Sequence, residues 1–456
     1  MYEAPLIFTC RGRIQKGSTL ERRFRELANA EYGFSDLIWG NMIAGKLPLC
    51  KKLGIPFLLL FSFLGCISIS AYAQQPNSTD TAALTRQKDA IDVLKKIFKA
   101  DQKKVDSSRL KKKFQFSLIP VAGSVAGGGT AIATTFNAAF YTGNESTTSL
   151  STITFTPWFT FTGKFVLPLR NLVWLPNDLL LWKGDTRFMI YPQYTWGIGG
   201  NTNPDNKTLL EYNYFRFYHS FLKKVGRKVL IGAGYNLDNH FNISLEKDST
   251  TLNKIPFFDY GDDFKKSTIS SGPVINFLID SRRNSVNPPG GAYLAVDYRF
   301  NPQFMGSTFD WQSVFIDARK YFSFDKHRQN ILAFWSYYWA VTNGKPPYLD
   351  LPSIGWDYYS RSGRGFQQNR HRGRGLFNFE SEYRKDISQN GFWGFVVFAN
   401  IHSVTEYEGN NFEYWHPAVG AGLRIKFNKI SRTNIGIDIA TSKDYTGVYF
   451  ALGEAF

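Results

Sequence analysis

Cysteine is scarce in this sequence and is confined to one end of the chain. The 456 residues include three cysteines, Cys10, Cys50 and Cys66, and all three precede Ala73. If the segment that ends at Ala73 is removed, the remaining chain contains no cysteine. Disulfide bonds, thiolate chemistry and a cysteine-ligated metal are then excluded from the mature protein.

Recognised catalytic motifs are also absent. The sequence contains no G-x-S-x-G, no H-E-x-x-H and no pair of histidines at metal-ligand spacing. His371 lies inside an arginine-rich run, and His219, His240 and His416 have no catalytic partner evident in the sequence. We therefore expect no catalytic residue, no metal, no cofactor and no enzyme activity. An enzyme at the membrane surface is the alternative, and it would require a histidine with a Ser or Asp partner.

The composition does not support a helical membrane protein. Such proteins are strongly hydrophobic overall, whereas the mean hydropathy of this chain is −0.26. Aromatic residues nevertheless make up 17% of the chain and charged residues only 20%. This combination is typical of a transmembrane β-barrel, because half of each strand faces a polar lumen.

The chain is basic, with a formal net charge of +17. One interpretation is a nucleic-acid binder, because the run SRSGRGFQQNRHRGR at 360–374 superficially resembles an RNA-binding segment. The other basic residues, however, are spread among strand-like segments. We therefore expect no nucleic-acid partner, and contact instead with the anionic headgroups of outer-membrane lipids and lipopolysaccharide.

The first part of the chain contains a pattern typical of a secretory signal peptide. A basic region, an apolar run and the small-x-small site Ala71-Tyr72-Ala73 follow one another within 42–73. We expect cleavage after Ala73 and translation from Met42, which makes 1–41 an over-extended N terminus. Mass analysis of the precursor tests this, because peptides from before Met42 would contradict it.

Two alternatives to cleavage remain open. Residues 53–73 are about long enough for a transmembrane helix, and Phe63-Leu64-Gly65-Cys66 loosely resembles a lipoprotein box. Residues 74–113 are polar and lysine-rich, and we expect a periplasmic linker there. Apolar residues at helical spacing within 81–100 favour a short amphipathic helix, and the alternative is a tether that becomes ordered only against the barrel. This linker is too short for a periplasmic domain.

From residue 114 to the end, apolar and polar residues alternate as they do in β-strands. The predicted fold is all-β: a transmembrane antiparallel β-barrel over 114–456 of about sixteen strands, with fourteen as the lower limit. The register is clearest where Val419 and Leu423 point outward while Arg424 and Lys426 point inward. The predicted strands are 114–121, 128–142, 147–161, 163–172, 184–196, 206–221, 228–244, 271–282, 291–301, 309–324, 329–343, 373–387, 391–404, 416–428, 432–441 and 445–455.

Charge and aromatic rings occupy opposite faces of the segment that follows the arginine-rich run. Asn378, Glu380, Glu382 and Arg384 share one face of an extended chain, and the other face carries Phe377, Phe379 and Tyr383. No helical segment is available to cover the rings. A wall that exposes them to lipid is therefore the simplest arrangement.

The chain ends in Val448-Tyr-Phe-Ala-Leu-Gly-Glu-Ala-Phe456. A closing strand with an aromatic carboxyl terminus is the signal that the outer-membrane insertion machinery recognises. We expect Phe450 and Phe456 to form this signal, and the barrel assembly machinery to insert the protein.

Three stretches resemble the bacterial surface antigen family, the BamA/TamA superfamily of outer-membrane barrels. Gly363-Arg364-Gly365-Phe366 resembles the V-R-G-F/Y tip of a loop. Asp280, Arg282 and Asn284, followed by Pro288 and Gly290, resemble a D-x-R-x-N…P-x-G strand and turn. Phe398-Ala-Asn400-Ile-His402 stands where the family has F-x-D-x-G. The resemblance is strongest over 270–456.

The resemblance implies a barrel without POTRA domains, in which an extracellular loop folds into the lumen. It implies that Arg364 pairs there with Glu382 and with the residue at 400, and Glu380 lies on the same inward face. Because Asn400 replaces an aspartate, we expect Arg364 to rely mainly on Glu382, with Asn400 supplying an amide oxygen. The alternative is that these are ordinary luminal charges beneath a solvated loop.

Asp280 and Arg282 lie two residues apart on one face of the predicted strand. We expect them to form an ion pair where that strand ends, ahead of the turn that contains Pro288.

The function implied is assistance in outer-membrane assembly: insertion of client outer-membrane proteins, or translocation of polypeptide or lipid. A passive pore or a purely structural barrel is the alternative.

Overall fold

A computed structural model describes residues 87–90, 92–93, 114–124, 130–245, 266–282, 284–325, 330–429 and 431–456. The predicted over-extended N terminus, the signal peptide with Ala71 and Ala73, and most of the linker lie outside the described residues. The description below concerns the unit Pro56–Phe456.

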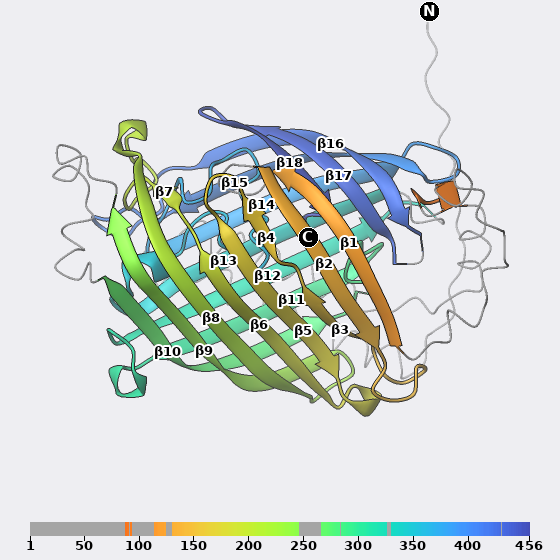
Figure 1. Cartoon of the computed structure of the whole chain (residues 1–456), viewed down its shortest axis with the longest axis horizontal. Coiled ribbons are helices and arrows are strands. Elements are labelled where there is room, and N and C mark those ends of the chain that lie inside the picture. The colour runs from red at the N-terminus through yellow and green to blue at the C-terminus, as the bar shows by residue number, and fades with distance from the viewer. Residues whose placement is uncertain are drawn as a thin grey trace, which may run out of the picture. The chain divides into compact units, whose positions relative to one another are not determined.

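β-strands form almost all the regular structure in the described residues (Figure 1). Four short 3₁₀ turns interrupt the connections: η1 (Pro176–Asp178), η2 (Pro204–Asn206), η3 (Gln303–Met305) and η4 (Tyr348–Asp350). The strands are β1 (Phe114–Ser124), β2 (Thr130–Phe140), β3 (Ser151–Phe155), β4 (Trp158–Thr160), β5 (Phe165–Trp174), β6 (Leu180–Ile190), β7 (Gln193–Thr195), β8 (Thr208–Lys224), β9 (Val229–Leu245), β10 (Ser267–Asp280), β11 (Gly291–Asn301), β12 (Trp311–Ser323), β13 (Asn330–Gly344), β14 (Gly375–Asp386), β15 (Trp393–Val404), β16 (His416–Asn428), β17 (Thr433–Thr441) and β18 (Thr446–Leu452).

The strands form one antiparallel sheet in which neighbours in sequence are neighbours in space. Two of the predicted strands are each interrupted once. β3 and β4 lie together between β2 and β5, and β7 continues β6 along β8. Pro157 and Pro192 stand at these interruptions, where a residue without an N–H cannot join the ladder. The sheet therefore has the sixteen strand positions that the sequence predicts.

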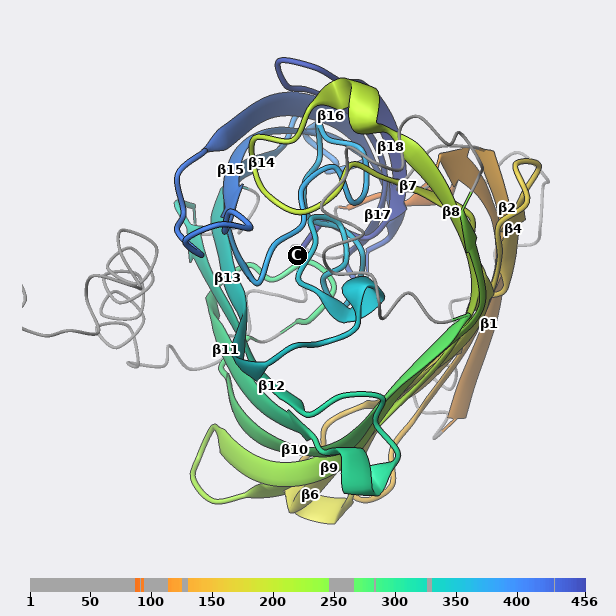
Figure 2. The same cartoon turned by 90° about the vertical axis from the view of Figure 1, so that its left-hand side faces the viewer.

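The sheet curves until its last strand, β18, contacts its first, β1, and Figure 2 shows the resulting ring. The described residues confirm the predicted all-β antiparallel barrel. In their part of the chain, no helix is both long enough and apolar enough to cross a membrane.

The two faces of the wall differ as the sequence predicts. On β17, Ile435, Ile437 and Ile439 are exposed on the outside, whereas Asn434 and Asp438 are buried inside. β16 shows the same alternation with the predicted register, since Val419 and Leu423 are exposed and Arg424 and Lys426 are buried. An apolar outer face and a polar inner face are typical of a barrel in lipid.

The connections differ between the two rims. Turns such as 225–228, 387–392 and 429–432 are short, whereas the connection 345–374 between β13 and β14 is long and folds into the ring (Figure 2).

The short described segment near residue 90 meets the rim that carries the short turns. Lys88 N donates to Asn390 O at 2.9 Å. Lys429 Nζ lies 2.7 Å from Asp92 Oδ2, and its backbone N donates to Asp89 Oδ2 at 3.1 Å.

Candidate functional site

The loop 345–374 makes a tight bend inside the barrel at Gly363-Arg364-Gly365-Phe366. Gly363 and Gly365 have φ values of +72° and +94°, a region of backbone conformation that favours glycine. A Cβ on Gly365 would lie 2.7 Å from the Cβ of Ala418 on β16. The bend therefore requires glycine, and it brings Arg364 against the inner wall.

Arg364 is 4% exposed and contacts three carboxylates. Its Nη2 donates to Glu380 and Glu382 on β14, and its Nη1 donates to Asp438 Oδ2 on β17 at 2.6 Å. Its Cζ lies 3.4 Å from the centroid of the Phe398 ring. The guanidinium thus connects the loop to two separate parts of the wall. The sequence indicated Glu380 and Glu382 as neighbours but gave no indication of Asp438.

Asn400 contacts Arg364 in a different way from the one predicted. Its Nδ2 donates to the backbone carbonyl of Arg364 at 2.8 Å. We expected its amide oxygen to accept from the guanidinium, and that expectation is wrong, because the side chain lies beside the loop backbone. Asn400 therefore helps to position the bend without contributing to charge compensation.

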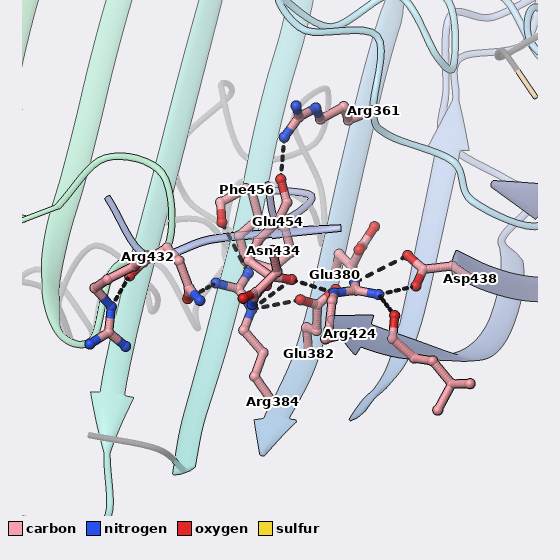
Figure 3. Close-up of polar contacts among 12 residues, drawn as sticks. Arg361, Glu380, Glu382, Arg384, Arg424, Arg432, Asn434, Asp438, Glu454 and Phe456 are labelled. Carbon is pink, nitrogen blue, oxygen red and sulfur yellow. Dashed lines mark hydrogen bonds and ion pairs between the residues drawn. The ribbon is translucent and has the colours of Figure 1, made fainter. Parts of the chain in front are cut away.

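The ion pairs of Arg364 continue into a larger network on the inner wall, and Figure 3 shows the part of this network around Arg384, Arg424 and Glu454. Arg384 Nε donates to Glu382 Oε1 at 2.6 Å, and Arg424 pairs with Asp438. Arg424 Nε also donates to Glu454 Oε2 at 2.8 Å.

Cations and anions alternate through this network, and the buried guanidinium groups all lie next to buried carboxylates. Removing one partner from such a network leaves the other charge buried and uncompensated, which is strongly destabilising. The network therefore holds one arrangement of loop and wall in place.

The end of the chain turns into the lumen. β18 ends at Leu452, Gly453 has a φ of +93°, and Phe456 is 3% exposed. The Phe456 ring lies 5.3 Å from that of Trp335, and its carbonyl oxygen accepts from Arg384 Nη2 at 3.0 Å. The expectation that Phe456 ends the closing strand is therefore wrong: the last four residues leave the wall at Gly453, and the C terminus lies within the ring in Figure 2.

Phe450, the other residue of the predicted C-terminal signal, stays on β18, where it is 42% exposed on the outer face.

The residues of the strand-turn motif lie together at the end of β10. Arg282 donates to Asp280 through both Nε (3.0 Å) and Nη2 (2.8 Å). Asn284 Oδ1 accepts from the backbone N of Val286 and Asn287, and its Nδ2 donates to Ser431 O at 3.1 Å. These contacts shape the turn that contains Pro288 and Gly290 and connect it to the turn before β17.

Three histidines, not identified as a group from the sequence, form a cluster beside the bend. His371 Nδ1 and His402 Nε2 are 2.8 Å apart, and the rings of His371 and His416 stack at 3.8 Å. Phe366 meets His402 edge-on at 4.5 Å. The histidine at 402 therefore packs closely against the loop, although the resembling family has glycine there.

Burial, together with the nearby His402 and His416, holds the pKa of the loop residue His371 well below its usual range. Only the register could have revealed the cluster, because His402 and His416 face each other across β15 and β16. Among the residues that the structure covers, no group of histidine, cysteine, aspartate or glutamate is arranged to hold a metal.

A second charged cluster, also not identified from the sequence, lies on β6, β8, β9 and β11. Arg187 Nε donates to Asp185 Oδ1 at 2.7 Å, Arg216 lies between Asp185 and Asp238, and Arg299 pairs with Asp238. Like the network around Arg364, it consists of buried, mutually compensated charges on the luminal face.

No protein-family model and no curated protein matches this sequence. Among solved structures, CdiB from Acinetobacter baumannii superposes with a TM-score of 0.51 at 12% identity, over 75% of this chain and 60% of CdiB. CdiB from Escherichia coli gives a TM-score of 0.50 at 10% identity, over 75% of this chain and 68% of that chain. BamA from Haemophilus ducreyi lacking POTRA domains 1–3 gives 0.49 at 11% identity, over 75% of this chain and 69% of that chain.

At these identities the similarity is one of fold. The chain spans less than two thirds of the A. baumannii CdiB chain. The described strands therefore share their barrel fold with the two CdiB structures.

Proposed function

We propose that this protein is an integral outer-membrane barrel that assists outer-membrane assembly, by inserting client outer-membrane proteins or by translocating polypeptide or lipid. Support for the location comes from the exposed apolar side chains on the outside of the wall and the buried charges inside it. Support for the role comes from the barrel fold, together with the motif at Gly363–Phe366 and its luminal partners.

The observation that carries the proposal is how the barrel closes. Registered antiparallel ladders join the strands on either side: eleven residue pairs between β1 and β2, and seven between β17 and β18. Between β1 and β18, both of which the structure describes, there is contact but no registered ladder. Strand edges that are not satisfied by each other are available to pair with another strand. A seam of this kind can open sideways and present its edges to a client.

The inward loop supports one side of this seam. Gly365 N donates to Tyr449 Oη on β18 at 2.8 Å, and Arg364 pairs with Asp438 on the adjacent strand β17. The same guanidinium reaches β14, which β15 and β16 separate from β17. The loop therefore ties β17 and β18 to β14, and it keeps this part of the barrel in shape while the seam opens.

Depletion of the protein in its native cell tests the role. We expect the amounts of outer-membrane proteins to fall, or the asymmetry of the outer-membrane lipids to be lost, within a few generations. Complementation with the wild-type chain restores both, and complementation with Arg364→Ala restores them poorly. A normal outer-membrane proteome and normal lipid asymmetry after depletion would falsify the assembly role.

Conductance in a planar bilayer distinguishes a passive pore from an assembly barrel. The loop 345–374 and the C-terminal residues both occupy the lumen, so we expect low, unsteady current from the wild-type protein. A large steady current that is unaltered by deletion of 360–374 would support the pore instead.

A further inference from the structure

The lumen contains a cavity that the proposed assembly role does not use. It lies between the inner faces of β8–β13 and the arm of the inward loop at 349–358, and its volume is about 90 Å³. A water needs roughly 10–15 Å³ by this measure, so the cavity has room for roughly six to nine waters. This volume suits one small ring-shaped molecule and its substituents.

Aromatic rings form much of the cavity wall. Tyr214 and Tyr218 come from β8, Trp311 from β12 and Trp339 from β13, and Trp356 comes from the loop arm. The Tyr214 ring meets the Trp356 ring edge-on at 6.4 Å, and its own face stacks on His240 at 4.3 Å. Such a lining favours a ligand with flat, weakly polar faces.

Three of the charged groups that line the cavity compensate one another: Asp238, Arg216 and Arg299. Asp238 accepts from Tyr218 Oη at 2.7 Å and pairs with both Arg216 and Arg299. Asp350, on the loop arm, accepts from Ser270 Oγ at 2.6 Å. A ligand with a net charge would have to separate these pairs, and an unpaired charge in this position is costly. The ligand that fits is therefore neutral.

Two donors that line the cavity still lack acceptors. The indole Nε1 of Trp356 and the Nε of Arg299 are buried and have no hydrogen-bond partner in the described part of the chain. Buried polar groups are normally satisfied, by protein, water or ligand. The cavity thus combines flat aromatic faces with hydrogen-bonding groups that a bound molecule can satisfy.

From this combination we propose that the cavity binds one neutral, polyhydroxylated ring, that is, a single sugar residue. The C–H faces of the ring stack on the aromatic side chains, and its hydroxyl groups accept from Trp356 and Arg299 and donate to the carboxylates. The source is a free monosaccharide or one residue of a lipid-borne saccharide, because both present the same ring. The proposal does not depend on the assembly role.

Binding is measured by saturation-transfer NMR on the full-length protein in a detergent without a sugar headgroup. The probes are glucose, galactose, N-acetylglucosamine and a delipidated core oligosaccharide, and glutamate and acetate serve as charged comparisons. We expect saturable binding of at least one sugar probe and none of the charged molecules. Binding of a monosaccharide identifies a free sugar as the source, whereas binding of the oligosaccharide alone identifies a lipid-borne one.

Two variants connect binding to the cavity. Ser313 lines it from β12, so Ser313→Phe fills the space and abolishes binding. Ser323→Phe, at the far end of the same strand, is the matched control and leaves binding unchanged. Trp356→Phe keeps a ring but loses the donor, so we expect affinity to fall about tenfold, as the loss of one hydrogen bond predicts.

Folding of each variant is checked by its heat-dependent mobility in detergent gels. The proposal is overturned if no sugar probe binds, if folded Ser313→Phe binds as the wild type does, or if the charged molecules bind in preference.

Discussion

Arg364 and Asp438 are joined by a 2.6 Å hydrogen bond between the inward loop and the wall, although they lie 74 residues apart in the sequence. This contact completes a set of three carboxylates around one guanidinium, since Glu380 and Glu382 occupy its other side. The loop is therefore fixed to β14 and to β17 by the same side chain. The strength of this connection can be measured directly.

Replacing Arg364 with alanine removes the positive charge that compensates three buried carboxylates. Breaking a buried pair from one side costs about 3–5 kcal/mol, so we expect the folded barrel to convert to the unfolded form at a clearly lower temperature in detergent gels. Arg370→Ala is the matched control, because Arg370 lies in the same loop and its guanidinium donates only to Thr202 in the described residues. Its effect should be much smaller.

The double variant Arg364→Ala/Asp438→Ala shows whether the two side chains act together. We expect its effect to be smaller than the sum of the single effects, because the second change removes a carboxylate that the first had left uncompensated. Strictly additive shifts in the conversion temperature would mean that the two groups do not interact.

An aspartate at position 400, the residue that the resembling family has there, should weaken this protein. Asn400 donates to the carbonyl of Arg364, and an aspartate carboxylate cannot donate. Asn400→Asp would place a further negative charge beside Glu380 and Glu382. Its carboxylate oxygen would also face the carbonyl oxygen of Arg364, and neither of these two acceptors can donate. We expect a loss of about 1–3 kcal/mol, measured as a lower conversion temperature. Asn400→Ala provides the comparison, and a more heat-resistant Asn400→Asp barrel would contradict the assigned contact.

The fold could be predicted because its signal is local. Apolar and polar residues alternate along each strand, and this alternation predicted about sixteen strand positions and the register of β16. Even the two interruptions have a local cause in Pro157 and Pro192. The pattern of neighbouring residues is therefore sufficient to predict such a barrel.

The candidate site could be predicted only in part, because several of its contacts join distant segments. The shared face of Glu380 and Glu382 follows from their spacing, but nothing in the sequence points from Arg364 to Asp438. The histidine cluster depends on the register between β15 and β16. The inward turn of the C terminus depends on a positive φ at Gly453, a conformation that the residue permits but does not require.

The inward position of Phe456 predicts different roles for two phenylalanines near the C terminus. Phe456→Ala removes a ring that packs on Trp335 and Tyr321, so we expect a loss of up to about 3–5 kcal/mol. Phe450→Ala is the matched control, because its ring lies on the exposed outer face of β18. The temperature of conversion in detergent gels should fall more for Phe456→Ala. Equal shifts would indicate that the C-terminal residues do not pack inside the barrel.

The docking of the loop arm at Asp350 should depend on pH. Burial, and then the charge of Asp238, raises the pKa of Asp350 from 3.8 to about 7, while Arg299 and Arg216 oppose that shift and His240 lies 3.7 Å away.

The folded protein therefore binds a proton at Asp350 that the unfolded chain releases, and this contribution to stability is lost as the pH rises from about 4 to about 7. Asp350→Asn resembles the neutral acid and can still accept from Ser270, so it should remove this part of the pH dependence. The conversion temperature of each protein is measured at about pH 5 and at about pH 8. Relative to the wild type, Asp350→Asn should be more stable at the higher pH than at the lower one. Asp444→Asn, at an exposed turn residue, should leave the wild-type difference unchanged. If Asp350→Asn also leaves it unchanged, Asp350 does not take up a proton on folding.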